Sequence, residues 1–265
     1  MKRSVRQGVH RIRQAREFRG VWPDGARAAL SITFDDARAS QPRIAHPVLA
    51  RLGVRATFFV LPQPLTQDRA AWQEMIAAGH EIGNHTVSHP CSGNFPWSRD
   101  RALEELTVAD IAREVDDADR QIEDALGVTP TVFAYPCGQT YVGRGRDTCS
   151  LVPFVADRFL AGRTFNDIVA NAPFHCDLAQ VAARDVDRLA FDQVRPALEA
   201  TVADRAWLVL GGHEIGHELA HETTRVDTLE AVVDWCREHR VWIDTVGAVA
   251  ASVRAATDQG VRRAT

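Results

Sequence analysis

The sequence predicts an α/β protein, a distorted (β/α) barrel with seven or eight strands in a single domain. Short apolar runs alternate with longer amphipathic runs, which is typical of parallel strands joined by crossover helices. The seven or eight repeated units favour a closed barrel, and the 265 residues contain no Gly/Ser- or Pro-rich linker that would divide them. An open doubly wound sheet remains an alternative, although no glycine-rich phosphate loop follows the first strand.

Each predicted element is a short run in this alternation. The first strand covers residues 28–36 and ends in two adjacent aspartates. The longest helix is expected at 107–126, where Thr107 is placed to cap it and Gly127 to end it. The other strands are expected at 56–60, 80–84, 131–135, 159–162, 181–186, 207–210 and 241–243. The other helices are expected at 42–52, 66–78, 191–204, 225–239 and 245–256.

Charge and hydropathy limit the partners of the chain. The net charge is −4, although the first twenty residues are basic. We therefore expect a basic N-terminal arm at 1–25. The barrel domain is expected at 26–256 and a C-terminal tail at 257–265. No aromatic-and-basic patch follows the arm, so we expect no nucleic acid partner. No apolar run is long enough to cross a membrane, so we expect no membrane contact and a cytoplasmic protein. Homo-oligomerisation is left open.

The cysteines give a separate indication of the chemical environment. The five cysteines form no C-x-x-C pair and are odd in number. That pattern predicts reduced thiols rather than a disulfide framework.

Polar residues with chemical potential follow several of the predicted strands. They are Asp35 and Asp36, His85 and His89, a Pro-Cys-Gly turn at 136–138, and His213. Because residues that follow barrel strands converge on one face, we expect these side chains to meet in one site.

His85 and His89 have the spacing of a chelating pair. Four residues apart, they would lie on one side of a helical turn and could bind one divalent ion. Asp36 could supply an oxygen ligand and leave positions open for water, whose pKa a metal lowers. For each histidine alone, a buried or loop histidine without a ligand is the alternative.

A competing metal motif lies at 213–217, where His-Glu-Ile-Gly-His matches the H-E-x-x-H pattern of zinc peptidases. That mechanism requires both histidines on a helix. Here a strand-like run and two glycines precede His213, and Gly216 disfavours a helix. We therefore interpret His213 as a residue at a strand end and keep the zinc peptidase as the alternative function.

Four segments resemble the motifs of the polysaccharide deacetylase family, carbohydrate esterase family 4. They are Thr-Phe-Asp-Asp at 33–36, His-Thr-Val-Ser-His at 85–89, Phe-Ala-Tyr-Pro-Cys-Gly at 133–138 and Leu-Gly-Gly-His at 210–213. The resemblance covers about residues 28–250.

The resemblance implies a role for each matching residue. Asp36, His85 and His89 would hold one divalent metal, Zn²⁺ before Co²⁺, Mn²⁺ or Ni²⁺. Asp35 would be the general base and His213 the general acid. The backbone N–H of Cys137 would stabilise the oxyanion. Substrate contacts are expected from Tyr135 and Pro136. Trp97 is a further candidate because it lies in the loop just after the histidine pair.

The chain also departs from the family pattern. An arginine that commonly pairs with the base in the third motif is replaced by Ala134, and Arg163 is a candidate substitute. The acidic partner of the catalytic histidine is not evident, and Asp185 or Asp187 is proposed. Cys137 stands where an aromatic residue is usual.

The predicted activity is metal-dependent removal of N-acetyl or O-acetyl groups from a carbohydrate or a related small acylated molecule. Besides the zinc peptidase, hydrolysis of a non-sugar C–N bond is an alternative within the wider superfamily. A third hypothesis is an inactive barrel that only binds sugar.

Overall fold

The computed structural model describes residues 21–264, and side chains through residue 258. Most of the predicted basic arm at 1–25 therefore lies outside the described residues. Within them, no helix is both long enough and apolar enough to span a membrane.

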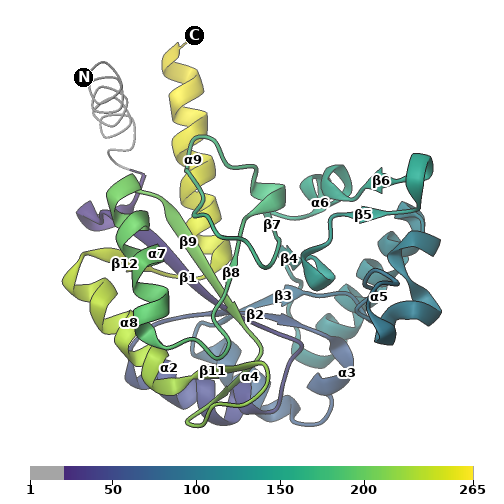
Figure 1. The fold of residues 1–265 in the computed structure, drawn as a ribbon, viewed down its shortest axis with the longest axis horizontal. Coiled ribbons are helices and arrows are strands. Elements are labelled where there is room, and N and C mark those ends of the chain that lie inside the picture. Colours follow the sequence, from purple (N-terminus) through teal and green to yellow (C-terminus); the bar gives the residue numbers. More distant parts are fainter. Residues whose placement is uncertain (1–20, 265) are drawn as a thin grey trace.

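Eight parallel strands form the central sheet of the described chain (Figure 1). They run in the order β7-β4-β3-β2-β1-β9-β8, and the eighth strand, β12, pairs with β1. Their bounds are β1 Ala28–Asp35, β2 Thr57–Val60, β3 Glu81–Asn84, β4 Val132–Ala134, β7 Ala161–Arg163, β8 Arg184–Asp185, β9 Trp207–Gly212 and β12 Val241–Ile243. The predicted fold class, a distorted (β/α) barrel with seven or eight strands, is confirmed.

Two irregular strand pairings distort the central sheet and curl it toward a barrel. β12 pairs with residues 28–30 of β1, whereas β2 pairs with residues 33–35, so two strands share one edge of β1. At the other end of the order, the segment before β8 returns to β7. There, Val181 N–H donates to the Gly162 carbonyl at 2.7 Å and the Val181 carbonyl accepts from Thr164 N–H at 2.9 Å.

Strand β1 is buried over its whole length, and its alternate residues face different cores. Leu30, Ile32 and Phe34 belong to the apolar cluster that also includes residues of helices α2, α4, α5, α7 and α8. Ala29 belongs to the cluster that includes Trp207 and residues of helix α9. Because successive side chains of a strand alternate between faces, Asp35 points the same way as Ala29, into the barrel.

Helices surround the sheet, with α2, α7 and α8 on one side of it and α5 and α6 on the other in Figure 1. Their bounds are α2 His46–Arg51, α3 Pro62–Leu65, α4 Arg69–Ala77, α5 Val108–Leu126, α6 Val152–Arg158, α7 Phe191–Asp204, α8 Val226–Glu238 and α9 Val246–Ala264. The predicted cap of α5 is present, because Thr107 Oγ1 accepts from the N–H of Asp110. Gly127 ends α5 in the left-handed conformation that glycine tolerates.

Some predicted elements differ from the observed ones. The helix expected at 66–78 is observed as α4, which starts after Asp68, and the short helix α3, with prolines at positions 62 and 64, precedes it and was not predicted. α9 continues to Ala264, through the segment expected as a tail, since its alanine- and arginine-rich sequence favours a helix. Two small sheets, β5–β6 and β10–β11, were not predicted. They pair Tyr141–Val142 with Cys149–Ser150 and Glu214–Gly216 with Thr223–Arg225.

Candidate active site

Both aspartates at the end of β1 stand at the mouth of the barrel. Asp35 is the last residue of the strand and is buried, and Asp36 turns the chain away with a φ of 71°. One oxygen of each carboxylate, Asp35 Oδ1 and Asp36 Oδ1, is buried without a hydrogen-bond partner among the described residues. Buried acceptors of this kind are rare in folded proteins and indicate a missing ligand.

The loop that carries His85 and His89 directly follows β3. It is not the helical turn that the spacing predicted, because Thr86 and His89 adopt positive φ values of 67° and 52°. The two rings nevertheless converge, with centroids 4.8 Å apart. Chelation therefore depends here on the loop conformation and not on helical periodicity.

A buried glutamate of α5 fixes this loop, and no sequence pattern predicted its role. Glu114 Oε2 accepts hydrogen bonds from the N–H groups of Val87 at 3.1 Å and Ser88 at 2.8 Å. Ser88 Oγ donates to Glu114 Oε1 at 3.1 Å, and Arg101 forms an ion pair with the same oxygen at 2.7 Å. Glu114 is thus a positioning residue for the two histidines.

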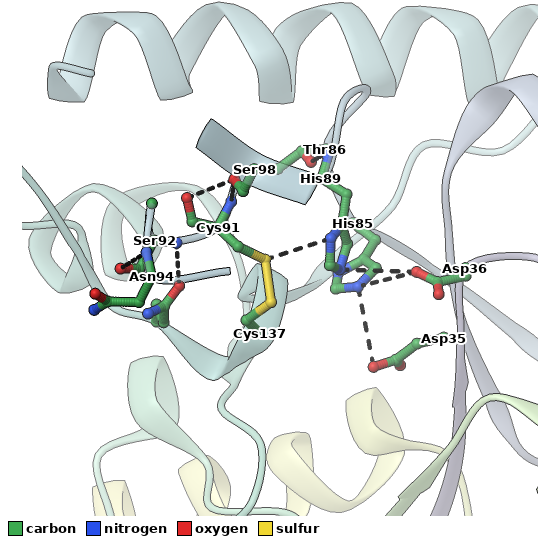
Figure 2. Close-up of a disulfide and its surroundings, with 12 residues drawn as sticks. Asp35, Asp36, His85, Thr86, His89, Cys91, Ser92, Asn94, Ser98 and Cys137 are labelled. Atoms are coloured by element: carbon green, nitrogen blue, oxygen red, sulfur yellow. Dashed lines mark hydrogen bonds and ion pairs between the residues drawn. A yellow bond between two sulfur atoms is a disulfide. The ribbon is translucent and has the colours of Figure 1, made fainter. Parts of the chain in front are cut away.

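The ligand atoms of Asp36, His85 and His89 lie within 4.8 Å of one another. Asp36 Oδ1 is 3.7 Å from His85 Nε2 and 3.8 Å from His89 Nε2 (Figure 2). His85 Nδ1–H donates to the Ala134 carbonyl at 2.8 Å, which leaves the lone pair of Nε2 directed at the aspartate. Two imidazoles and one carboxylate are a donor set that suits a divalent transition metal.

The electrostatics also suit a cation. Burial alone would raise the pKa of Asp36, but the charges of His85 and His89 outweigh it, so the pKa of Asp36 is lowered. Burial, together with the neighbouring His85, lowers the pKa of His89 to about 4. At neutral pH the site therefore offers an ionised carboxylate and a neutral His89 imidazole, as metal binding requires. Arg38 also contacts Asp36, through Oδ2 at 2.9 Å.

Asp35 has the cationic partner that the sequence left undecided. Arg163, at the end of β7, is fully buried and donates from Nη2 to Asp35 Oδ2 at 2.5 Å. Its guanidinium lies over the rings of Phe59 and Phe165, 4.8 and 5.1 Å from their centroids. An arginine from a different strand thus occupies the position that the third-motif arginine, replaced by Ala134, was expected to fill.

His213 follows β9, and its acidic partner is Asp187. His213 Nδ1 and Asp187 Oδ2 are 2.7 Å apart, and Thr224 Oγ1 donates to Asp187 Oδ1 at 2.7 Å. Burial alone would lower the pKa of His213, but the hydrogen bond to Asp187 and the charge of Asp35 outweigh it and raise the pKa to about 9. Of the two proposed acids, Asp187 holds the histidine and Asp185 does not.

A cleft of about 1010 Å³ lies over these residues. Its lining includes Asp35, Asp36, Cys137 and His213, and an aromatic wall of Phe95 and Trp97. The Trp97 ring stacks on Phe95 with centroids 4.8 Å apart and is 70% exposed, which leaves its other face free for a ligand.

Two predicted substrate contacts are less accessible. Tyr135 is buried and its hydroxyl donates to the Ala179 carbonyl at 2.8 Å, although part of the residue lines the cleft. Pro136 is buried and is absent from the lining. Both belong to the turn that leads out of β4, where Tyr135 keeps a place in the cleft wall and Pro136 is covered.

Cys137 is part of a disulfide, and the prediction of reduced thiols was wrong for it. Cys91 and Cys137 are joined with a Cα–Cα distance of 6.0 Å (Figure 2). The two residues are 46 positions apart, and only the fold brings the loop after β3 beside the turn after β4. Cys149, Cys176 and Cys236 are free thiols.

The second metal motif does not form a site. Glu214–Gly216 is the extended strand β10, so His213 and His217 do not share a helical face. Glu214 accepts a hydrogen bond from Ser40, and neither Glu214 nor His217 lines the cleft. Among the described residues, the metal-capable groups do not include His217.

The sequence model of the family described as polysaccharide deacetylase matches residues 24–147, which include the aspartate pair, the histidine loop and the turn after β4. A chitooligosaccharide deacetylase of Rhizobium leguminosarum bv. phaseoli is 42% identical over 78 residues, covering 28% of this chain and 34% of that protein. The matches to curated relatives cover between 5% and 34% of those proteins' lengths.

Solved structures share the fold at lower identity. A polysaccharide deacetylase-like protein from Mycobacterium smegmatis superimposes with a TM-score of 0.62 and 17% identity, over 88% of this chain and 92% of the other. A CE4 family pseudoenzyme from Bacillus anthracis gives a TM-score of 0.54 and 15% identity, over 84% of this chain and 65% of the other. The matched segment and its motif residues show that residues 24–147 are similar to the polysaccharide deacetylase family, and the solved structures share the barrel fold of the chain.

Proposed function

We propose that this chain is a metal-dependent hydrolase that removes acetyl groups, N-linked or O-linked, from a carbohydrate or a related small acylated molecule. One observation carries the proposal. Two imidazoles, those of His85 and His89, converge on an unpartnered carboxylate oxygen, Asp36 Oδ1, in the same cleft as Asp35 and His213. That combination supplies a ligand set, a base and an acid within one cavity.

A divalent ion fits Asp36, His85 and His89 on the chemistry of the donors. The set has two imidazole nitrogens with available lone pairs and one buried acceptor that no protein group satisfies. Zn²⁺ is the expected ion, with Co²⁺, Mn²⁺ and Ni²⁺ as alternatives. A bound ion of this kind would acidify the attacking water and polarise the acyl carbonyl.

Asp35 is suited to take the proton from the attacking water. Its unpartnered Oδ1 is available, while its other oxygen is held by Arg163, so the carboxylate keeps a fixed direction. Gln41 reinforces this geometry, because its Nε2 donates to the backbone carbonyls of both Asp35 and His213, at 2.6 and 3.0 Å. The base and the acid are therefore tied to each other through one buried side chain.

His213 is suited to give a proton to the leaving amine or alcohol. Its elevated pKa keeps it protonated at neutral pH, and Asp187 fixes the ring through Nδ1, which leaves Nε2–H as the donor. The backbone N–H of Cys137 is the proposed donor to the oxyanion.

The substrate class follows from the shape of the cleft. A volume of about 1010 Å³ exceeds what a single acetylated sugar needs, so a short oligosaccharide is the expected ligand. Trp97, 70% exposed beside the site, offers a flat face on which a sugar ring could stack.

The compartment of the protein is also a proposal. The charge and hydropathy of the sequence predicted the cytoplasm, whereas the Cys91–Cys137 disulfide favours an oxidising compartment. We favour the oxidising compartment, because disulfides persist there, and this one joins the fully buried Cys91 to the half-buried Cys137 at the catalytic face.

Acetate release from the purified, Zn²⁺-loaded protein tests the function. The names of relatives suggest chitooligosaccharides, acetyl xylan and peptidoglycan fragments as the first panel. We expect turnover of at least one of them, together with one metal per chain by elemental analysis. The His85→Ala/His89→Ala variant should lose both metal and turnover, whereas His217→Ala, at an exposed position outside the cleft, should keep both.

The outcomes separate the alternatives. Metal binding without turnover on the whole panel would favour the sugar-binding inactive barrel, a precedent for which is the pseudoenzyme of the same fold. Loss of metal only in His217→Ala would restore the peptidase hypothesis. No metal in the wild-type protein after reconstitution would refute the proposal.

A further inference from the structure

The disulfide lies directly against one of the proposed metal ligands. Cys91 follows His89 by two residues, and its Sγ is 3.5 Å from His89 Nδ1 (Figure 2). On the other side of the same ring, His89 Nε2 is 3.8 Å from Asp36 Oδ1. His89 therefore faces a carboxylate with one nitrogen and a sulfur pair with the other.

Two overlapping sets of metal-capable groups result. One is Asp36, His85 and His89, and the other is His89, Cys91 and Cys137, with ligand atoms within 4.8 Å in each. They share only His89. The disulfide blocks the second set, because sulfurs bonded to each other have no thiolate charge to offer a metal.

The backbone would keep the two cysteines together if the bond between them were broken. Cys91 N–H donates to Ser98 Oγ at 2.9 Å, and the Cys91 carbonyl accepts from Ser98 Oγ at 2.7 Å and from Leu103 N–H at 3.0 Å. The turn at Cys137 is closed by a hydrogen bond from Gly138 N–H to the Tyr135 carbonyl at 2.8 Å. None of these contacts involves sulfur.

The distances required by a metal are within reach of this arrangement. Two thiolates on one Zn²⁺, each at about 2.3 Å in tetrahedral geometry, have sulfurs roughly 3.7 Å apart. The Cα atoms are 6.0 Å apart, so rotation about the Cα–Cβ bonds can provide that separation. Cys91 is fully buried, whereas Cys137 is half-buried and lines the cleft, which gives a metal access to the two sulfurs from the cleft.

We propose that reduction of the Cys91–Cys137 disulfide creates a second metal site, formed by both thiolates and His89 Nδ1, for a thiophilic divalent cation such as Zn²⁺, Co²⁺ or Cd²⁺. With a phosphine reductant, the S–S bond breaks, phosphorus is oxidised to the phosphine oxide with oxygen from water, and two thiols form. Metal binding then displaces one proton from each thiol.

The new site has a consequence for the proposed catalytic site, and this consequence rests on the proposed function. A metal bound to the two thiolates would pull the His89 ring toward the sulfurs. It would also place a second positive charge beside the site formed by Asp36, His85 and His89. The disulfide thus keeps His89 available to Asp36 and His85. Reduction in the presence of thiophilic metal should therefore weaken metal binding at the catalytic site.

Co²⁺ absorption tests the proposal without any measurement of activity. Thiolate-to-cobalt charge transfer gives an intense near-ultraviolet band, which nitrogen and oxygen ligands do not give. We expect no such band when Co²⁺ is added to the oxidised wild-type protein, and a band that saturates at one equivalent of thiolate-bound Co²⁺ after phosphine reduction. Absence of the band in reduced, folded protein would overturn the proposal.

Matched variants locate the site. Cys91→Ser/Cys137→Ser should show no band under either condition, and His89→Ala should bind Co²⁺ at least about 10-fold more weakly after reduction. Cys149→Ser/Cys176→Ser should behave as wild type, and Cys236 is buried with a pKa raised to about 12 by burial. A band that persists in the Cys91→Ser/Cys137→Ser protein would assign it to other thiols and refute the site.

The proposed function can fail separately. Oxidised, metal-loaded protein that releases no acetate contradicts the deacetylase proposal and leaves the spectroscopic result unaffected. A missing thiolate band together with normal acetate release contradicts only the thiolate site.

Discussion

The two ends of the neighbouring strands β1, β2 and β3 hold buried polar groups in opposite ways. At their amino ends, Glu81 Oε2 accepts from Thr57 Oγ1 at 2.7 Å and from Gly247 N–H at 3.0 Å. There, His80 Nδ1 accepts from Ala56 N–H at 3.1 Å. At the carboxyl face, Asp35 Oδ1 and Asp36 Oδ1 have no partner among the described residues.

This difference in hydrogen bonding distinguishes the end of the barrel that stabilises the fold from the end that is available to a ligand. A buried polar group that is fully hydrogen-bonded contributes to a rigid, specific fold, whereas an unsatisfied one costs free energy that a ligand can recover. The amino-end network joins β2 and β3 to the start of α9 through Gly247. The carboxyl face leaves acceptors open, and this is the face that has the cleft.

The largest expected effect is at Asp35. Asp35→Asn removes the proposed base but none of the proposed metal ligands, so kcat should fall about 10³-fold while metal content stays at one per chain. The matched carboxylate near the amino end is Asp244, which pairs with Arg55 at 2.6 Å. Asp244→Asn should lower stability and leave kcat within about threefold. Equal loss of kcat in both variants would break the contrast between the ends.

Glu114 does not line the cleft, but it holds the loop that carries two of the proposed metal ligands. Glu114→Ala removes three hydrogen bonds from the loop between His85 and His89, so metal affinity should fall about 10- to 100-fold. Glu114→Gln retains acceptor oxygens and should lose less. Glu123→Ala, an exposed glutamate on the same helix, is the control for titrations with Co²⁺. An unchanged dissociation constant in Glu114→Ala would show that the loop holds its conformation without this residue.

The pH profile tests the acid at the same end. His213 must be protonated to act as an acid, so its pKa of about 9 predicts that kcat falls as the pH rises through that region. A bound cation would oppose this rise through repulsion, so we expect the alkaline limb of the metal-loaded protein below pH 9. Asp187→Asn removes the charge that holds the proton, so the alkaline limb should move to lower pH and kcat at pH 8 should fall about 10-fold. If the alkaline limb stays at the same pH in Asp187→Asn, the group that titrates there is not His213.

Much of this contrast was visible in the sequence. Apolar runs that end in Asp35, His85 or His213 predicted both the barrel and the face on which the residues meet, because residues after parallel strands converge. Arg163 was a correct candidate for the partner of Asp35, and Asp187 was one of two candidates for the partner of His213.

The rest depends on contacts that no local pattern encodes. The conformation at 85–89 is set by Glu114, which lies 26 residues beyond Ser88, so helical spacing gave the wrong local geometry. Pairing of Cys91 with Cys137 likewise requires two strand ends to be adjacent. Pro136 was carried over as a substrate contact from motif position alone, and only the burial of the turn shows that it is covered.

The smallest expected effect concerns the amino end and acid stability. Burial, with the nearby charges of His46 and Arg55, lowers the pKa of His80 from 6.5 to about 4. The unfolded chain therefore binds a proton at this position before the folded one as the pH falls. Its contribution to stability is complete above pH 6.5 and is lost as the pH falls toward about 4.

His80→Gln keeps an acceptor for Ala56 N–H but cannot titrate. Urea unfolding of wild type and variant between pH 7 and pH 4 should show a free-energy difference that shrinks by about 1–2 kcal/mol on acidification, after allowance for solvent screening. His175→Gln, at an exposed position, should show no such trend, and metal content should be unchanged in both. A difference that is constant with pH would mean that His80 stabilises the amino end only by packing, and a loss of metal would mean that the two ends are coupled.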